Sequence, residues 1–377
     1  MYEKWNSNPV TIAYDSQMPI STIPLPAVTV CPLIKSRVEV FNLTWAMEMF
    51  VQNLTMDTNS KRKLRALAHV CPFVEYWKTF SYSKKETVVP DLRKMSHTLQ
   101  DVIVYCKWRF SVVPCKDMMV EQLLDDGICY TFNSLSSGEI YRADKISLDF
   151  LNMSNTTPSS DWTREEGYPS DTGFNGYPFR PLSNGLYSAF IFMATTRDID
   201  RDPMCMTAYT GYKIAVHSPD EVARMKDSFF RIESLSVVTL TITPTVYKAS
   251  PILRKYSPEK RNCYFSNERH LKFFRIYNKV NCETECNANY TLALCGCVKF
   301  SMPRSPGTKI CDASKIACYS QTTIYRPGVE PTNFNHKKIL NCNCLPSCNS
   351  IKYQVEMSRA PLSSKRYPWK LDFLEDE

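Results

Sequence analysis

Ten cysteines lie within the 86 residues from Cys263 to Cys348, and thiols at this density can bind a metal or pair as disulfides. Structural zinc sites favour cysteine pairs separated by two to four residues, often together with histidines. Here the repeated spacing is C-x-C, and neither His270 nor His336 stands at ligand spacing from a cysteine. We therefore expect disulfides, with no metal site.

The spacing of these cysteines predicts an antiparallel ladder. Cys282 and Cys286 are four residues apart and share one face of a helix, whereas Cys342 and Cys344 are two apart and share one face of a strand. Laid antiparallel, the two elements bring Cys282 to Cys344 and Cys286 to Cys342. The nested pairs Cys263–Cys348, Cys295–Cys318 and Cys297–Cys311 complete the ladder. At about 2–4 kcal/mol per bridge, the ladder would dominate local stability.

Other features indicate an extracellular compartment. The total of 16 cysteines is even, as a fully paired secreted protein requires. Five N-x-S/T sequons mark candidate glycosylation sites at Asn42, Asn53, Asn152, Asn155 and Asn289. Polar residues follow Met1, so no signal peptide is expected, and no run of about 18 apolar residues predicts a membrane span. We interpret the chain as an extracellular domain cut away from flanking membrane segments.

No catalytic chemistry is indicated. The chain has 377 residues, 44% hydrophobic and 22% charged, which is ordinary globular usage. It contains no G-x-S-x-G, no glycine-rich phosphate loop and no H-E-x-x-H, and its five histidines are dispersed. The net charge of +8 comes from short, scattered basic runs, which we interpret as solvated faces. The prediction is a protein that is not an enzyme and has no cofactor and no nucleic-acid partner.

His217 is the most suggestive of the histidines, because it ends a predicted strand beside Asp220 and Glu221. The ordinary pKa of histidine would suit a proton sensor at this position. A strand-end histidine bonded to the backbone explains the same pattern, and the sequence leaves both interpretations open.

Helices are expected mainly in the first third of the chain, where residues 40–106 look helical. The best helix opens at Pro90-Asp91, with apolar residues at spacings of three and four as far as Cys106. Cys106 and Cys115 would close a small loop, and a second helix is expected over 116–125. Asp125 and Asp126 would then be solvated acids at its end.

Strands are expected at 25–31, 129–132, 186–194, 211–217 and 235–247. In the last of these, Val238, Leu240 and Ile242 alternate with threonines, as in a half-buried antiparallel strand. Residues 151–185 are rich in Ser, Asn, Gly and Pro and are expected to form a surface insertion. Helices grouped at the ends of an antiparallel sheet predict an α+β fold.

Several motifs resemble the degenerin/epithelial sodium channel superfamily, in the family's order and over about nine tenths of the chain. Leu25–Cys31 (L-P-A-V-T-V-C) resembles its F-P-A-V-T-x-C element, with Leu25 in place of the usual Phe. Gly127–Asn133 (G-I-C-Y-T-F-N) and Gly211–Ser218 (G-Y-K-I-A-V-H-S) resemble two of its strands. The ladder has the family's thumb spacing, and M-P-R at 302–304 with C-x-C-L-P-x-C at 342–348 looks most like the pickpocket branch.

The resemblance implies a hand-shaped extracellular domain. Residues 1–24 would be a wrist segment after the first membrane helix, 25–262 the palm, β-ball and finger, and 263–348 the thumb. Residues 349–377 would return toward the palm and knuckle, ending before the second membrane helix. The resemblance also implies two further bridges, Cys71–Cys129 and Cys31–Cys205.

The implied function is the sensing and gating region of an amiloride-sensitive-type sodium channel subunit at the plasma membrane. Such subunits form homo- or heterotrimers around a sodium pore, held in the membrane by flanking helices. Trp5, Tyr256 and His217 are candidates for coupling the thumb to the pore, and the stimulus, mechanical or chemical, stays open. Acid sensing is not carried over, because no facing set of carboxylates can be matched. A secreted cysteine-rich ligand-binding protein and an intracellular metal-binding protein are the alternatives.

Overall fold

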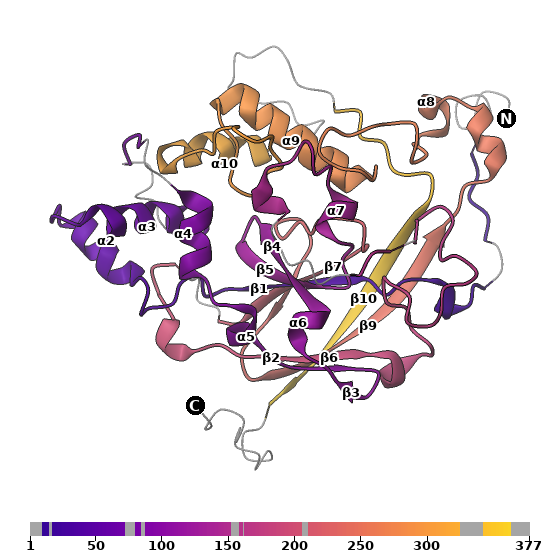
Figure 1. The fold of residues 1–377 in the computed structure, drawn as a ribbon, viewed down its shortest axis with the longest axis horizontal. Coiled ribbons are helices and arrows are strands. Elements are labelled where there is room, and N and C mark those ends of the chain that lie inside the picture. Colours follow the sequence, from indigo (N-terminus) through magenta and orange to yellow (C-terminus); the bar gives the residue numbers. More distant parts are fainter. Residues whose placement is uncertain are drawn as a thin grey trace.

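A computed structural model describes residues 10–14, 17–71, 80–83, 87–151, 158–160, 162–205, 210–324 and 342–362. Helices and antiparallel sheets are combined in an α+β arrangement, with the helices grouped above and to one side of the sheets (Figure 1). Among these residues, no helix has both the length and the apolar composition that crossing a bilayer requires.

A five-stranded antiparallel sheet lies at the centre, in the order β4-β5-β1-β7-β8. Its strands are β1 (Ala27–Pro32), β4 (Met119–Leu124), β5 (Gly127–Phe132), β7 (Tyr212–His217) and β8 (Phe230–Ile232). All six residues of β5 and five of the six residues of β1 are buried. Because both faces of these strands are covered, apolar and polar residues do not alternate along them. Gly211 precedes β7 with φ +117°, and a Cβ there would lie 2.0 Å from the carbonyl oxygen of Ile232. Only glycine fits at this approach of β7 to β8.

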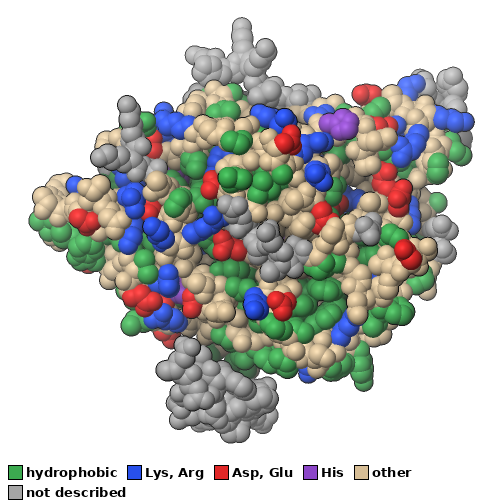
Figure 2. All heavy atoms as spheres, in the orientation of Figure 1, with side chains coloured by type: hydrophobic (Ala, Val, Ile, Leu, Met, Phe, Trp, Pro, Cys, Tyr) green, Lys and Arg blue, Asp and Glu red, His purple; other side chains and the backbone are tan. Residues whose placement is uncertain are grey.

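Two smaller antiparallel sheets flank the central one. The first has the order β3-β2-β6, with β2 (Ile103–Trp108), β3 (Ser111–Val112) and β6 (Phe190–Ala194). Apolar side chains are exposed on the face in Figure 2 over the part of the molecule where these strands lie. The second is a long ribbon of β9 (Ser236–Tyr247) and β10 (Ser350–Pro361), paired over all twelve residues of each strand.

The helices fall into two groups with shorter turns between the strands (Figure 1). One group is α2 (Leu43–Val51), α3 (Thr58–Ala68) and α4 (Val88–Met95), and the other is α9 (Lys279–Cys295) and α10 (Ile316–Ile324). The short α-helices are α5 (Leu99–Val102), α6 (Cys115–Met118), α7 (Ser137–Ile140) and α8 (Pro258–Arg261). The 3₁₀ turns are η1 (Ile20–Thr22), η3 (Leu148–Phe150), η4 (Gly185–Ser188), η5 (Asp198–Asp200), η6 (Pro251–Lys255) and η7 (Ala313–Lys315). One main hydrophobic cluster joins both helix groups to the sheet.

The helix predicted to run from Pro90 through Cys106 is wrong in its second half. α4 ends at Met95, where the Ser96 hydroxyl donates to the Leu92 carbonyl oxygen at 2.8 Å. Thr98 then starts the single turn α5 with a capping box to Asp101, and β2 begins at Ile103. The run Val102-Ile103-Val104 is β-branched, which favours extended backbone over helix.

The second predicted helix, over 116–125, is also wrong. Only Cys115–Met118 forms a helical turn, after which β4 runs antiparallel to β5. Leu123 and Leu124 are both buried, because the hairpin is covered on its two faces, and this double burial imitates a helical apolar pattern. Asp125 and Asp126 therefore lie in a hairpin turn and not at the end of a helix.

The predicted strands are present with small changes in their bounds. β1, β5, β7 and β9 match the predictions, and β6 begins at Phe190 after the turn η4 instead of at residue 186. β3, β8 and β10 were not predicted, and β2 and β4 lie where helices were predicted. The expected insertion, residues 151–185, is described at 151, 158–160 and 162–185, and these residues contain no strand or helix beyond an isolated bridge between Thr163 and Gly167 and the start of η4 at Gly185.

All 16 cysteines are paired in eight disulfides, as expected from their even number. Six pairs are those that the spacing predicts: Cys106–Cys115, Cys263–Cys348, Cys282–Cys344, Cys286–Cys342, Cys295–Cys318 and Cys297–Cys311. The two pairs implied by resemblance are wrong, since Cys31 pairs with Cys129 and Cys71 with Cys205. The reason is register. β1 and β5 pair at Val30↔Tyr130, which places Cys31 opposite Cys129 with their Cα atoms 4.4 Å apart.

Candidate functional site at the base of the disulfide ladder

The residues from Cys263 to Cys348, here called the ladder segment, are built on α9. Asn278 caps its N-terminus by accepting from the Asn281 backbone N–H at 2.7 Å, and Gly296 ends it in the left-handed conformation at φ 69°. Cys282 and Cys286 stand one turn apart on this helix. Their bridges join α9 to the returning segment at Cα–Cα distances of 5.7 and 5.9 Å. The strand predicted through Cys342 and Cys344 is wrong, because residues 342–346 form no strand and Asn343 is left-handed at φ 43°. The ladder segment is thus covalently braced along one side of α9.

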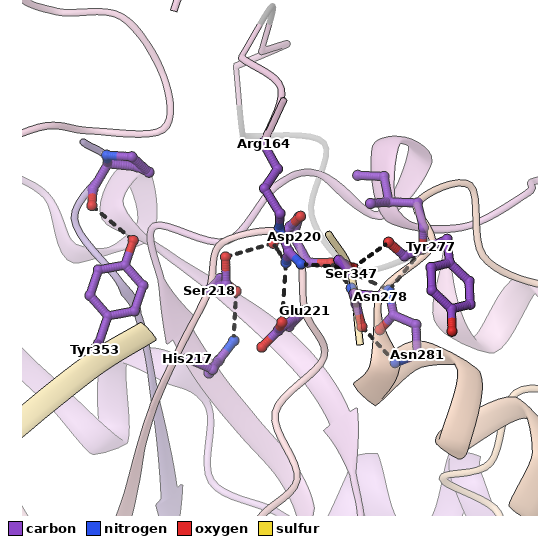
Figure 3. A network of polar contacts seen from close by, with 12 residues as sticks. Arg164, His217, Ser218, Asp220, Glu221, Tyr277, Asn278, Asn281, Ser347 and Tyr353 are labelled. Atoms are coloured by element: carbon purple, nitrogen blue, oxygen red, sulfur yellow. Dashed lines mark hydrogen bonds and ion pairs between the residues drawn. The ribbon is translucent and has the colours of Figure 1, made fainter. Parts of the chain in front are cut away.

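A buried ionic junction lies where the ladder segment meets the central sheet (Figure 3). The Arg164 guanidinium, with 8% of its side chain exposed, contacts Asp220 Oδ1 at 2.5 Å and Glu221 Oε1 at 3.1 Å. It also donates to the Ser347 hydroxyl at 3.4 Å. The four residues come from the 158–184 loop, the segment after β7 and the end of the ladder. One side chain therefore joins three parts of the chain that are distant in sequence.

The electrostatics of the junction follow from one cation facing two acids. Burial alone would lower the pKa of Arg164, but Asp220 and Glu221 raise it above its usual range. Burial raises the pKa of Glu221, and the neighbouring Asp220 adds to this effect against the opposing influence of Arg164. Arg164 offsets the burial of Glu221 only in part, because it makes its shorter contact with Asp220. The arginine is permanently charged and cannot fully compensate both carboxylates.

The same segment is tied to the start of α9. The backbone oxygen of Asp220 accepts from Asn278 Nδ2 at 3.1 Å and from Asn281 Nδ2 at 3.4 Å, and both asparagines are buried. The Ser218 hydroxyl donates to Asp220 Oδ1 at 2.6 Å. Asp220 thus bonds to the loop through its carboxylate and to the ladder helix through its backbone. We call Arg164, Asp220, Glu221, Asn278 and Asn281 the ladder junction.

His217 lies beside this junction at the end of β7 and is half-buried. Its Nδ1 bonds the Ser218 carbonyl oxygen at 3.0 Å and its Nε2 bonds the Thr29 hydroxyl of β1 at 2.9 Å. In the neutral tautomer Nδ1–H donates and Nε2 accepts from Thr29, so both ring nitrogens are satisfied. Burial lowers the pKa of His217 to about 4. The backbone-bonded alternative describes this side chain, and it is neutral near physiological pH.

A second contact between ladder and sheet lies at the β4–β5 turn. Lys299, 2% exposed, contacts Asp125 Oδ1 at 2.9 Å and donates to the Asp125 carbonyl oxygen at 3.0 Å. Burial works against ionisation of Asp125, but Lys299 and its neighbours lower the pKa of the carboxyl below its usual range. Asp126, in turn, contacts Lys213 of β7 at 2.7 Å. The expectation that these two acids are solvated is therefore wrong.

The other predicted site residues lie apart from the ladder junction. Tyr256 follows η6 and is half-buried, and its carbonyl oxygen accepts from Arg261 Nη1 at 2.5 Å. Trp5 lies outside the described residues, as do the sequons at Asn152 and Asn155. Asn42, Asn53 and Asn289 are exposed, as a glycan would require, and their glycosylation stays a prediction.

Sequence reasoning noticed the acids after His217 but missed Arg164, Asn278 and Asn281. The N-x-x-N spacing just before a helix is a recognisable capping signal for the two asparagines. Arg164 carries no signal, because it lies in a segment without periodicity. Its role depends on the tertiary fold alone.

The ribbon β9–β10 is tied to the central sheet near the same place (Figure 3). The Tyr353 hydroxyl on β10 donates to the carbonyl oxygen of Pro24, just ahead of β1, at 2.9 Å. These contacts brace the ribbon, the central sheet and the ladder segment against one another.

On the face in Figure 2, basic and acidic side chains are interspersed, without one large basic field.

Comparison of the sequence with known proteins identifies a family. The family model for the amiloride-sensitive sodium channel matches residues 1–375. Pickpocket protein 28 of Drosophila melanogaster is 25% identical over 374 residues, which cover 97% of this chain and 57% of that protein. Sodium channel protein Nach of Drosophila ananassae is 24% identical over 367 residues, covering 96% of this chain and 63% of that protein.

A third relative, Pickpocket protein 11 of Drosophila melanogaster, is 24% identical over 176 residues, covering 45% of this chain and 32% of that protein. The chain thus spans less than two thirds of the length of each of these curated relatives. The family is one of ion channels and not of enzymes, in agreement with the prediction from the motifs. The chain belongs to the amiloride-sensitive sodium channel family, in the pickpocket branch of the degenerin/epithelial sodium channel superfamily.

Proposed function

We propose that this chain is the extracellular sensing and gating region of a sodium channel subunit at the plasma membrane. Family membership supports a channel subunit, and the eight disulfides and the sequons support an extracellular position. In this proposal the subunit forms homo- or heterotrimers, and sodium passes through a pore made by membrane helices of the subunits.

The hand-like division belongs to the same proposal. Residues 1–24 would lead from the membrane, 25–262 would form palm, β-ball and finger, 263–348 the thumb, and 349–377 the return toward palm and knuckle. The helix groups α2–α4 and α9–α10, which lie to one side of and above the sheets in Figure 1, are compatible with this division.

The ladder segment would act as a lever, and the ladder junction carries this part of the proposal. Disulfides along α9 remove the soft motions that would dissipate a displacement. At the base of the lever, Arg164 and the two asparagines attach it to the end of β7. Because the asparagine contacts with the Asp220 carbonyl oxygen are buried, a shift of α9 would move Asp220, which Arg164 holds by its carboxylate, or break these hydrogen bonds.

The test is Arg164→Gln in the channel subunit that carries this region, expressed in oocytes. Amiloride-sensitive current is recorded under voltage clamp and divided by the surface density of the subunit. The matched control is Arg254→Gln, because Arg254 is 45% exposed and pairs loosely with Glu165 at 3.5 Å. We expect Arg164→Gln to change the current per surface subunit about fivefold or more, the lower range of allosteric coupling. Unchanged current at equal density, as in the control, would contradict the lever.

A further inference from the structure

A cleft of about 260 Å³ lies between the α4–α5 connection and the β4–β5 hairpin, away from the ladder junction. Its floor is apolar and firmly packed, since Met119, Ile128 and Tyr130 are each less than 10% exposed. The Tyr130 hydroxyl donates to the His97 carbonyl oxygen at 2.7 Å, so the phenol holds the α4–α5 connection in place above the hairpin. The cleft is therefore preformed on rigid elements, and its volume exceeds the roughly 150 Å³ that holds a benzene molecule.

The charged residues of the cleft leave an excess of positive charge. Arg93 Nε contacts Glu121 Oε1 at 3.2 Å, so the only carboxylate lining the cleft is already paired. Lys116 also lines the cleft, is exposed, and has no ion-pair partner in the part of the chain that the structure describes. An apolar floor with one uncompensated ammonium at its edge is complementary to an amphipathic anion.

We propose that this cleft binds a small organic anion, with a carboxylate on an aromatic ring or short aliphatic body. The body packs on Met119, Ile128 and Tyr130, and the carboxylate meets Lys116. A cationic ligand is disfavoured, because Glu121 is engaged with Arg93 and Lys116 would repel a second cation.

The cleft is also connected to the ladder segment. β4 and β5 run from the cleft to the Asp125–Asp126 turn, which Lys299 holds at 2.9 Å. A bound ligand that shifts the β4–β5 hairpin relative to α5 would also move the Asp125–Asp126 turn, which Lys299 contacts. This consequence for gating rests on the proposed function, whereas binding itself does not.

The binding test uses residues 1–377 secreted behind an added signal sequence, with benzoate as the probe and benzylamine as its cationic counterpart. Isothermal titration is expected to show saturable benzoate binding and at least tenfold weaker binding of benzylamine. Lys116→Gln should weaken benzoate binding about five- to tenfold, because a charge-assisted contact is lost. Lys94→Gln is the matched control, because Lys94 is exposed on α4 and does not line the cleft.

A second variant, Leu99→Trp, places a large side chain at the cleft lining and should abolish benzoate binding. A non-reducing peptide map and circular dichroism show whether each variant is folded. If Leu99→Trp misfolds, Lys116→Gln still tests the proposal, because Lys116 is exposed and its substitution leaves the core intact. Absence of saturable benzoate binding, equal binding in Lys116→Gln, or a preference for benzylamine would overturn the proposal. If benzoate does not bind but Arg164→Gln still alters the current, the ligand-binding proposal is overturned and the proposed gating function is not.

Discussion

Removing the cation of the ladder junction should strongly destabilise the folded chain. Arg164→Gln leaves Asp220, whose side chain is 1% exposed, and Glu221, 21% exposed, facing each other without a positive charge. Breaking a buried ion pair by removing one partner costs about 3–5 kcal/mol, and the lower end applies because Glu221 is in partial contact with solvent. We therefore expect Arg164→Gln to lower the free energy of unfolding by about 3 kcal/mol.

The loss of stability in Arg164→Gln should come mainly from the broken ion pair with Asp220 and not from lost packing of the arginine side chain alone. Asp220→Asn keeps the shape of the side chain and removes one of the two negative charges. In the double variant Arg164→Gln/Asp220→Asn, the two losses should therefore sum to about 1–2 kcal/mol more than the measured total. Arg254→Gln, which breaks an exposed pair, should cost less than about 1 kcal/mol.

The assay is urea unfolding of the secreted chain with its disulfides intact, followed by near-ultraviolet circular dichroism at pH 7. The unsubstituted chain and its four variants are compared at the same ionic strength, because the exposed control pair is screened by salt. An Arg164→Gln loss no larger than that of Arg254→Gln, or strictly additive single-variant losses, would refute the argument from burial.

Three further outcomes are expected. A non-reducing peptide map should recover Cys31–Cys129 and Cys71–Cys205, and recovery of Cys31 with Cys205 would refute the β1–β5 register. Because the folded-state pKa of His217 is about 4 and its ordinary value is 6.5, neutral His217 stabilises the fold fully above pH 6.5. That contribution, at most about 3 kcal/mol, is lost as the pH falls toward 4, and His217→Gln should flatten the pH dependence of unfolding. Parallel curves for the two proteins would contradict the lowered pKa. Asp125→Asn leaves the buried Lys299 facing an amide and should cost about 2–4 kcal/mol in urea unfolding, and a loss below about 1 kcal/mol would argue against a buried pair.

The parts of the fold that were predictable depend on short-range spacing. Cys282 and Cys286 lie one helical turn apart, and Cys342 and Cys344 are two residues apart, so the order of their pairing follows from the spacing even though residues 342–346 form no strand. The alternation in β9 was equally legible, because one face of that strand is half-buried and the other is exposed.

The errors arose where tertiary burial overrides local pattern. β4 is covered on both faces, and its apolar residues at spacings of three and four imitate a helix. The end of α4 at Ser96 and the start of β2 depend on caps and on β-branched residues, which a periodicity argument weighs too little.

The sequence by itself determined the chemistry of this protein: an oxidised, non-catalytic chain with a nested ladder and the motifs of a channel family. Only the tertiary structure decided which distant residues meet. Cys31 finds Cys129 because β1 pairs with β5 in one register, and Arg164 finds Asp220 because a loop without periodicity folds over the end of β7. Local spacing limits what a segment can form, whereas contacts across a hundred residues are selected by burial and charge in the assembled core.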